Sequence, residues 1–481
     1  MSQEKKKPDT EEQDLMQKVV SLCKRRGFIF PSSEIYGGLR SAYDYGPLGV
    51  ELKRNVMNEW WRSMVHERED VVGIDTSIIM SPRVWEASGH VSGFSDPLVD
   101  CLLCKTRFRA DKAPKVTPGQ PVKFRVEGKT LSEPATRAYV CPECGSPRLS
   151  EERQFNLMFR TNLGPIDSDD STVYLRPETA QGMFVNFLNV QQTYRLKIPF
   201  GIAQQGKSFR NEITVEHFIF RSCEFEQMEM EFFCEPGTDD RWLDYWKDER
   251  FGWYLRLGAR KENLRLRAHE KDELAHYAKG CYDVEYRYPW GWDELEGIAN
   301  RTDYDLRKHE EHSGKKLSYF DQQKVDPETG KPGFRYLPYV IEPAAGATRS
   351  VLMFLIDAYD EEPPSEAREE GRVVLRLHPR LAPIKVAVLP LVKKDDWLRD
   401  KAREIVKGFW GASVNAFYDE KDAIGRRYAR QDEAGTPFCL TVDNQTRDDD
   451  TVTIRYRDDM RQERIKVAQA VAVVQDKVRS S

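Results

Sequence analysis

The stretch that decides the fold reads SFRNE at residues 208–212 and, after a loop, FRSCEFEQME at residues 220–229. Side chains on a strand point alternately to its two faces, so residues two apart share a face. We therefore expect Arg210 and Glu212 to lie together on one face of a first strand. The segment after the loop is expected to return as a second strand.

The returning strand should place Phe225, Gln227 and Glu229 on one face. An arginine, a carboxylate and an aromatic ring side by side can form a nucleotide site. The arginine binds a phosphate, the ring stacks on a base, and the carboxylate accepts a hydrogen bond from an exocyclic amine. Taken alone, this stretch fits a surface hairpin with alternating charges equally well.

A third element reads YVIEPAAGATR at residues 339–349 and is followed by the apolar run Val351–Ile356. This pattern predicts a strand, a turn of small residues and then a helix. Arg349 would lie in the first helical turn, where free N–H groups and the helix dipole favour phosphate. A tightly packed strand–helix corner with one exposed arginine explains this segment alone better than a ligand site does.

The chain has 481 residues, which suggests about two to four domains. Aromatic residues make up 11% of it and include ten tryptophans, which argues against disorder. The longest apolar run has six residues, too few to span a bilayer, and the N-terminus lacks the apolar core of a secretory signal. We expect a soluble, cytoplasmic protein. The net charge of −5 restricts any nucleic-acid contact to a local patch.

Several segments differ in composition and spacing. One apolar face of a predicted long helix contains Leu52, Val56, Met57, Trp60, Trp61 and Met64, and Trp242–Arg267 also has helical spacing. Residues 98–150 resemble an insertion rich in Pro, Gly and Lys, and Glu361–Arg372 is typical of a linker. A slightly basic unit is expected after it, with Val386–Leu389 and Cys439–Val442 as central strands and Ala468–Arg479 as a closing helix.

Two Cys-x-x-Cys pairs lie in the expected insertion. Each pair can place two thiolates on one side of a tight turn, and two such turns make a tetrahedral site that suits structural zinc. Four reduced thiols in a loop are the alternative. Single thiols explain the remaining cysteines, and no histidine has a spacing that suggests a Cys–His pair. The expected zinc ligands are Cys101, Cys104, Cys141 and Cys144, and the remaining cysteines are Cys23, Cys223, Cys234, Cys281 and Cys439.

Together, the Arg-x-Glu strand, the aromatic on the return strand and the later Gly-x-x-Arg resemble motifs 2 and 3 of class II aminoacyl-tRNA synthetases. Further blocks narrow the resemblance to the homodimeric glycyl-tRNA synthetase family, from about residue 15 to the end of the chain. These blocks are CKRRGFIF at 23–30, SEIYGG at 33–38, YDYGPLG at 43–49, YLRPETAQG at 174–182 and DEAGTPF at 432–438.

This resemblance implies an α/β (α+β) fold with a mixed, mostly antiparallel catalytic sheet. The catalytic domain would span residues 1–382, with the zinc-bearing insertion at 98–150, and an α/β anticodon-binding domain would span 383–481. Such enzymes activate glycine with ATP to glycyl-adenylate and pass the glycyl group to tRNA(Gly). The resemblance also implies a homodimer, with the helix after Tyr45–Gly49 near the interface, although the paired tryptophans of that helix can equally be intrachain core.

For ATP, the resemblance implies three catalytic residues. Arg210 would hold the α-phosphate, Glu212 would read the adenine amine, and Arg349 would take the γ-phosphate. Phe225 would stack on the adenine, and Glu294 is a candidate Mg²⁺ ligand. The full ATP set is Arg210, Asn211, Glu212, Phe220, Arg221, Glu224, Phe225, Glu294, Leu295, Gly346 and Arg349.

For glycine, the resemblance implies a small acidic pocket in which Glu178, Glu229 and Glu342 receive the ammonium group. Ala344 stands where the family usually has serine, and Cys223 stands where it usually has arginine. The glycine set is Arg109, Glu178, Phe225, Glu226, Gln227, Glu229, Glu342, Ala344 and Gly346.

Three alternatives stay open at this point. The chain can be a synthetase-like RNA-binding accessory protein without catalysis, although the implied catalytic residues are retained. It can be a zinc-ribbon nucleic-acid module beside an unrelated domain, which leaves the Arg-x-Glu and Gly-x-x-Arg elements unexplained. It can also be a synthetase for another small amino acid.

Overall fold

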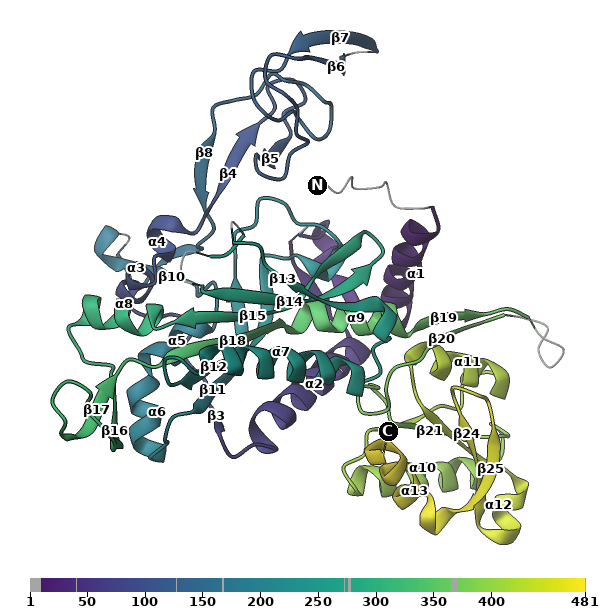
Figure 1. Cartoon of the computed structure of the whole chain (residues 1–481). Helices are drawn as coiled ribbons and strands as arrows, with labels where there is room; N and C mark the ends of the chain where they lie inside the picture. The colour runs from purple at the N-terminus through teal and green to yellow at the C-terminus, as the bar shows by residue number, and fades with distance from the viewer. Residues whose placement is uncertain are drawn as a thin grey trace.

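The computed structural model describes residues 10–480 except residues 40, 127, 167, 272, 276–277 and 365–370. The expected N-terminal tail and the middle of the expected linker therefore lie largely outside the described residues. Figure 1 shows a central body, an arm that projects from it, and a smaller C-terminal domain on the side away from the arm.

The body is built on a seven-stranded sheet in the order β13-β14-β15-β18-β12-β11-β3. All neighbours pair antiparallel except β11 and β3, so the predicted mixed, mostly antiparallel sheet is confirmed. The strands are β3 (Val71–Gly73), β11 (Phe200–Phe209), β12 (Glu224–Cys234), β13 (Leu264–Ala268), β14 (Gly280–Tyr288), β15 (Gly291–Thr302) and β18 (Tyr339–Gly346).

Helices cover the apolar face of this sheet. Met228, Met230 and Phe232 of β12 point into a core that also contains side chains from α2, α7 and α9. The body helices are α1 (Thr10–Arg26), α2 (Pro47–Trp61), α3 (Pro82–Ala87), α4 (His90–Gly93), α5 (Ala180–Val185), α6 (Phe187–Tyr194), α7 (Asp239–Arg256), α8 (Tyr304–Ser313) and α9 (Ala347–Ala358).

Most of the predicted apolar face lies in this intrachain core. Leu52, Val56 and Trp60 of α2 are buried, as is Met64 just after the helix, whereas Met57 and Trp61 are partly buried and pack against the core. The prediction of a helix to Arg267 was wrong beyond the end of α7. The chain turns at Gly258, whose φ of 86° belongs to the left-handed region that favours glycine, and continues as β13.

Short hairpins surround the main sheet. Each consists of two antiparallel strands. They are β1 (Ile29–Pro31) with β2 (Tyr43–Tyr45), β9 (Arg160–Asn162) with β10 (Thr172–Tyr174), β16 (Tyr319–Val325) with β17 (Pro332–Tyr336), and β19 (Tyr359–Glu362) with β20 (Arg372–Leu375).

The arm is the cysteine-bearing insertion (Figure 1). Its base is a three-stranded sheet in which the outgoing and returning strands β4 and β8 pair antiparallel, with Ser95 opposite Asn156. This unit is therefore slightly wider than the predicted 98–150. Its strands are β4 (Ser95–Asp100), β5 (Arg107–Arg109), β6 (Pro121–Val126), β7 (Lys129–Pro134) and β8 (Arg153–Asn156).

The C-terminal domain has its own five-stranded sheet in the order β22-β21-β23-β24-β25 and its own apolar core. The two predicted central strands correspond to β21 and β23, and the predicted closing helix to α13. The elements are β21 (Val386–Pro390), α10 (Asp396–Gly411), β22 (Ala416–Tyr418), α11 (Ile424–Ala434), β23 (Phe438–Val442), α12 (Asn444–Asp449), β24 (Thr451–Tyr456), β25 (Gln462–Lys466) and α13 (Val467–Ser480).

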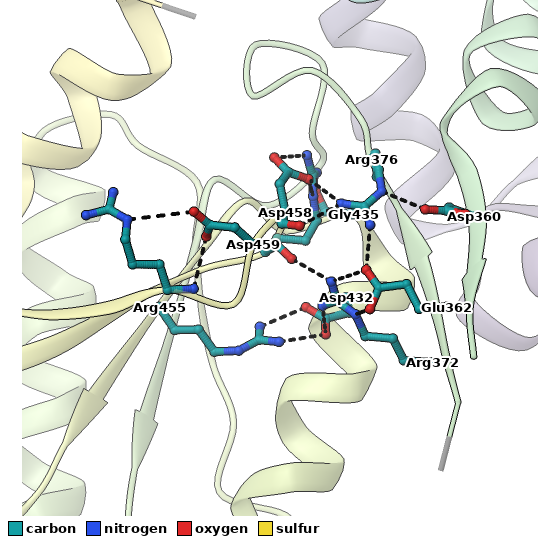
Figure 2. A network of polar contacts seen from close by, with 11 residues as sticks. Asp360, Glu362, Arg372, Arg376, Asp432, Gly435, Arg455, Asp458 and Asp459 are labelled. Carbon is teal, nitrogen blue, oxygen red and sulfur yellow. Dashed lines mark hydrogen bonds and ion pairs between the residues drawn. The ribbon is translucent and has the colours of Figure 1, made fainter. Parts of the chain in front are cut away.

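The described ends of the expected linker belong to the paired strands β19 and β20, which bind the C-terminal domain through buried charges. Arg372 donates to Glu362 at 2.6 Å and to Asp432 of α11 at 2.8 Å. Arg455 of β24 donates to both oxygens of Asp432 at 2.9 Å. Figure 2 shows these residues as one connected network, so the ends of the segment predicted as a linker form a paired contact with the C-terminal domain.

Candidate active site

A cavity lies against the sheet face opposite α7 and α9. Side chains from β12, β14, β15 and β18 line it, together with the segment after β11 and the start of α9. The residues predicted for ATP or glycine that line this cavity are Glu178, Arg210, Glu212, Phe220, Arg221, Phe225, Gln227, Glu229, Glu294, Glu342, Ala344, Gly346 and Arg349.

Two predicted residues on β12 face away from the cavity. Glu224 pairs with Lys207, and Glu226 pairs with Lys53 of α2. Side chains alternate along the strand, so Glu226 cannot share a face with Phe225 and Gln227. Neither side chain lines the cavity, and the ligand contacts predicted for these two residues stay predictions.

Three further predicted residues do not line the cavity. Leu295 is fully buried in the apolar core, at an irregularity in the pairing of β14 and β15. Asn211 is held through its backbone N–H, which donates to Leu157 O at 2.8 Å. Arg109 belongs to the insertion and pairs with Asp96 at 2.7 Å.

Arg210 and Glu212 lie in the segment after β11, which ends at Phe209, so their placement on a strand was wrong. Both side chains nevertheless line the cavity. Arg210 Nε donates to Pro177 O at 3.0 Å, and its guanidinium lies 5.3 Å from the Phe225 ring centroid. An arginine thus lies beside an aromatic ring that lines the cavity, as a nucleotide site requires.

Arg349 lies in the first turn of α9, as predicted. Its guanidinium lies 4.6 Å from the Phe220 ring centroid and 3.2 Å from Glu294 Oε2. The Arg349 charge keeps the pKa of Glu294 below its ordinary value. A Cβ on Gly346 would lie only 3.3 Å from Arg349 Cγ, so the glycine leaves room for this side chain to fold back over the turn.

Glu178, Glu229 and Glu342 form the acidic end of the cavity. Burial raises the pKa of Glu229, and the charge of Glu178 raises it further. Burial acts in the same direction on Glu178, but His90, 3.4 Å away, together with Arg301 and Gln181 outweighs it and lowers the pKa. Burial raises the pKa of Glu342 to about 8 against the effect of Arg301. This end therefore favours a ligand that brings a positive charge.

Curated proteins from several organisms are similar over nearly the whole chain. The glycine–tRNA ligase of Treponema denticola is 52% identical over 467 residues, 97% of this chain and 97% of its own. That of Acetivibrio thermocellus is 53% identical over 469 residues, 96% and 98% of the two chains. That of Bifidobacterium longum is 55% identical over 469 residues, 96% and 93% of the two chains.

The chain belongs to the glycine–tRNA ligase family. A family model described as an anticodon binding domain also matches residues 385–477. Within the described residues, no helix combines the length and apolar character that crossing a membrane requires.

Sequence patterns missed several residues of this glycine–tRNA ligase cavity. Arg301 donates to Glu342 Oε2 at 2.7 Å and to both oxygens of Asp305, at 2.8 and 3.0 Å. Arg301 shares a face of β15 with Gly297 and Ala299, and this alternation is the one sequence signal that would have found it. His269, Cys281 and Asp283 were also missed, although all three line the cavity.

The four cysteines predicted as zinc ligands converge in the insertion. Cys101 Sγ lies 3.7 Å from Cys144 Sγ, and Cys104 Sγ lies 3.5 Å from Cys141 Sγ. In a tetrahedral site with Zn–S bonds of about 2.3 Å, the sulfur atoms lie about 3.8 Å apart. The donor set and its spacing therefore fit a structural zinc ion, and four thiolates would leave no open coordination position.

Proposed function

We propose that the cavity joins glycine to ATP and that the same site then transfers the glycyl group to the 3′ end of tRNA(Gly). The strongest support is that one cavity contains both ends of such a site. The carboxyls of Glu178, Glu229 and Glu342 form one end, and Arg210 and Arg349 lie toward the other. A substrate with an ammonium group at one end can thus meet a nucleotide held by its phosphates.

The first step needs no covalent enzyme intermediate. A carboxylate oxygen of glycine forms a bond to the α-phosphorus of ATP, the bond from that phosphorus to pyrophosphate breaks, and pyrophosphate leaves. Arg210 would hold the α-phosphate and the glycine carboxylate, while Phe225 stacks on the adenine and Glu212 reads its amine. Such catalysis consists of positioning and charge neutralisation.

In the second step, a ribose hydroxyl at the 3′ end of the tRNA attacks the glycyl carbonyl carbon, loses its proton, and AMP leaves. The C-terminal domain that matches an anticodon binding domain would hold the other end of the same tRNA. We propose that this reaction takes place in the cytoplasm.

Glu294 is our candidate protein ligand for the Mg²⁺ that accompanies ATP, because Mg²⁺ prefers carboxylate and phosphate oxygens. Neutralising phosphate charge is the chemistry that this ion supplies. Glu294 also orients Arg349, which donates to the Glu294 backbone oxygen at 3.3 Å as well as pairing with its carboxylate.

A synthetase-like accessory protein without catalysis is the alternative. Such a protein has no need for Arg210 and Arg349 in the same cavity as Phe225 and three glutamates, and keeping these glutamates close together works against folding. The family relationship and this cavity together favour the enzyme.

Glycine-dependent exchange of pyrophosphate into ATP tests the proposal. We expect Arg210→Ala and Arg349→Ala each to reduce exchange at least about a hundredfold, since each removes a charge-assisted contact that strengthens in the transition state. Arg54→Ala, on the exposed side of α2, is the matched control and should keep full exchange. All three variants should unfold thermally close to the wild type. Near-normal exchange in Arg210→Ala or Arg349→Ala would contradict the assignment.

We also propose that the chain works as a homodimer. The apolar face of α2 is buried within the chain, but the preceding segment leaves Ile35, Tyr36 and Leu39 exposed at 88%, 87% and 60%. A second copy is the occupant that the family resemblance implies for this apolar segment.

Sedimentation of the wild type should therefore give the mass of two chains. Replacing Ile35 and Tyr36 by Ser should shift the mass toward one chain, because the contact loses its apolar area. Tyr194→Ser removes an exposed tyrosine elsewhere and should leave the dimer intact. A wild-type mass of one chain at working concentrations would rule out the dimer.

A further inference from the structure

A histidine, a cysteine and an aspartate meet on one wall of the cavity. His269 follows β13, and Cys281 and Asp283 lie two residues apart on β14. A ring nitrogen of His269, Cys281 Sγ and a carboxylate oxygen of Asp283 all lie within 4.8 Å of one another. All three residues line the cavity that we assign to ATP and glycine.

The β13–β14 pairing brings these residues together. Cys281 and Asp283 share a face of β14 because they are two apart. The backbone N–H of His269 donates to Cys281 O at 3.0 Å, so His269 lies directly opposite Cys281. Sequence spacing did not indicate this proximity, because 11 residues separate His269 from Cys281 in the chain.

Nitrogen, thiolate and carboxylate donors form a ligand set that suits Zn²⁺, and reactive zinc sites combine three protein ligands with one open position. His269 Nε2 lies 2.7 Å from Asp283 Oδ2, a hydrogen-bond distance. Two ligands of a tetrahedral zinc ion lie about 3.3 Å apart or more. A metal would therefore take the place of this hydrogen bond after a small opening of the two side chains.

A neighbouring arginine holds the carboxylate of this cluster in place. Arg267 donates to Asp283 Oδ2 at 2.9 Å and to Glu285 Oε1 at 2.8 Å. Outer contacts of this kind fix the orientation of metal ligands. The cluster also has access from the cavity, so an ion can enter without unfolding the strands.

We propose that His269, Cys281 and Asp283 form a second metal site, distinct from the four-cysteine site, and that Zn²⁺ bound there inhibits adenylate formation. A Cβ added to Gly297 would lie 3.9 Å from Asp283 Oδ1 and 3.9 Å from Glu294 Oε1, so the cluster borders the candidate Mg²⁺ ligand. A Zn²⁺ ion on the cluster would therefore repel an Mg²⁺ ion held by Glu294. The inhibition rests on the function proposed above, whereas the metal binding does not.

Metal binding is tested without reference to activity. Wild-type protein is dialysed against micromolar Zn²⁺, and bound zinc is counted per chain. We expect two zinc ions in the wild type and one in Cys281→Ser and in His269→Gln, which remove different ligands in case one variant folds poorly. Cys223→Ser removes a thiol outside the cluster and should keep two. One zinc in the wild type, or two in both cluster variants, overturns the site.

Cobalt identifies the ligands. Co²⁺ added to protein whose first site already holds zinc should give a sulfur-to-cobalt charge-transfer absorption in the wild type and in Cys223→Ser. This absorption should be missing in Cys281→Ser, since its sulfur ligand is gone. The same spectrum in wild type and Cys281→Ser overturns the assignment of the thiolate.

Inhibition is then tested by pyrophosphate exchange. Zn²⁺ should inhibit the wild type, and Cys281→Ser should need at least about tenfold more Zn²⁺ for the same inhibition, since even outer-shell changes weaken metal sites by this factor. A second bound zinc that leaves exchange unchanged overturns the inhibitory role. If the protein lacks exchange activity altogether, the proposed function fails, and the zinc counts and the cobalt spectrum still decide whether the site exists.

Discussion

Burial raises the pKa of Glu342 to about 8, and the charges of Glu229 and Glu178 add to this effect while Arg301 opposes it. An unfolded chain loses the proton of this carboxyl near its ordinary value of 4.5. Between these two values the folded state binds more protons than the unfolded state. The contribution of Glu342 to the free energy of unfolding therefore falls as pH rises through this range.

We predict that the effect of glycine on the Tm of the protein depends on pH through the carboxyl of Glu342. Between pH 6 and pH 8.5, wild-type Tm should fall more than Tm of Glu342→Gln, because the amide has no proton to lose. Added glycine should restore wild-type Tm more at pH 8.5 than at pH 6, since its ammonium pairs with the ionised carboxylate. Thermal unfolding at both pH values measures this.

Glu86→Gln alters an exposed carboxyl and should follow the wild type. Identical pH slopes for the wild type and Glu342→Gln would show that Glu342 does not carry this proton.

At the scale of single residues, strand periodicity carried most of the information about the site. It predicted that Phe225, Gln227 and Glu229 share a face, and the cavity lining confirms this. The same rule places Glu226 on the opposite face of the strand. Only the family resemblance had included Glu226 among the glycine-binding residues. The alternation along β15 was the one signal for Arg301, and its contact with Glu342 left no local pattern because the two residues lie 41 apart in the chain.

Among the elements, the insertion depends most on a few side chains. Its apolar core contains few residues, and Cys101 and Cys141 are two of them. Chains with so little core are usually stabilised by a metal or by disulfides. All nine cysteines are free thiols, which leaves the metal as the expected stabiliser.

We predict one tightly held zinc ion in this element. Cys141→Ser, or removal of zinc by a chelator, should speed amide hydrogen exchange in residues 95–156 well before it changes exchange in the main sheet. Exchange measured by mass spectrometry with and without chelator tests this prediction. Equal protection of the insertion in both conditions would refute a structural metal.

Element types were predictable where period and turn residues agreed, as in the strands β12 and β18. The hairpin β19–β20 was not, since its sequence is polar with Pro and Gly and looks like a linker. Its strands form because Arg372 and Arg376 each bind Glu362, and such contacts between charged side chains leave no periodic pattern.

At the scale of the whole molecule, a buried charge network joins the body to the C-terminal domain (Figure 2). Arg372, Asp432 and Arg455 are exposed by only 7%, 2% and 6%. Removing one partner from a buried ion pair is destabilising by roughly 3–5 kcal/mol, because the remaining charge stays buried without compensation. Asp432 neutralises two arginines at once, so it is the most sensitive member.

We predict that Asp432→Asn loosens the C-terminal domain relative to the body. Pyrophosphate exchange should stay within about twofold of the wild type, since the cavity lies elsewhere, whereas glycylation of tRNA should fall at least about tenfold. Asp476→Asn changes an exposed acid of α13 and should leave both activities intact. A parallel loss of both activities in Asp432→Asn would contradict this division of roles.

The pairing of β4 with β8 makes the insertion an exchangeable module. Its chain leaves the body and returns to it through adjacent antiparallel strands, with Ser95 opposite Asn156. Evolution can therefore lengthen, shorten or replace this outgrowth in a single event without rerouting the main sheet. A protein engineer can use the same junction to graft a reporter domain, and the strand pair would transmit its position to the rim of the cavity.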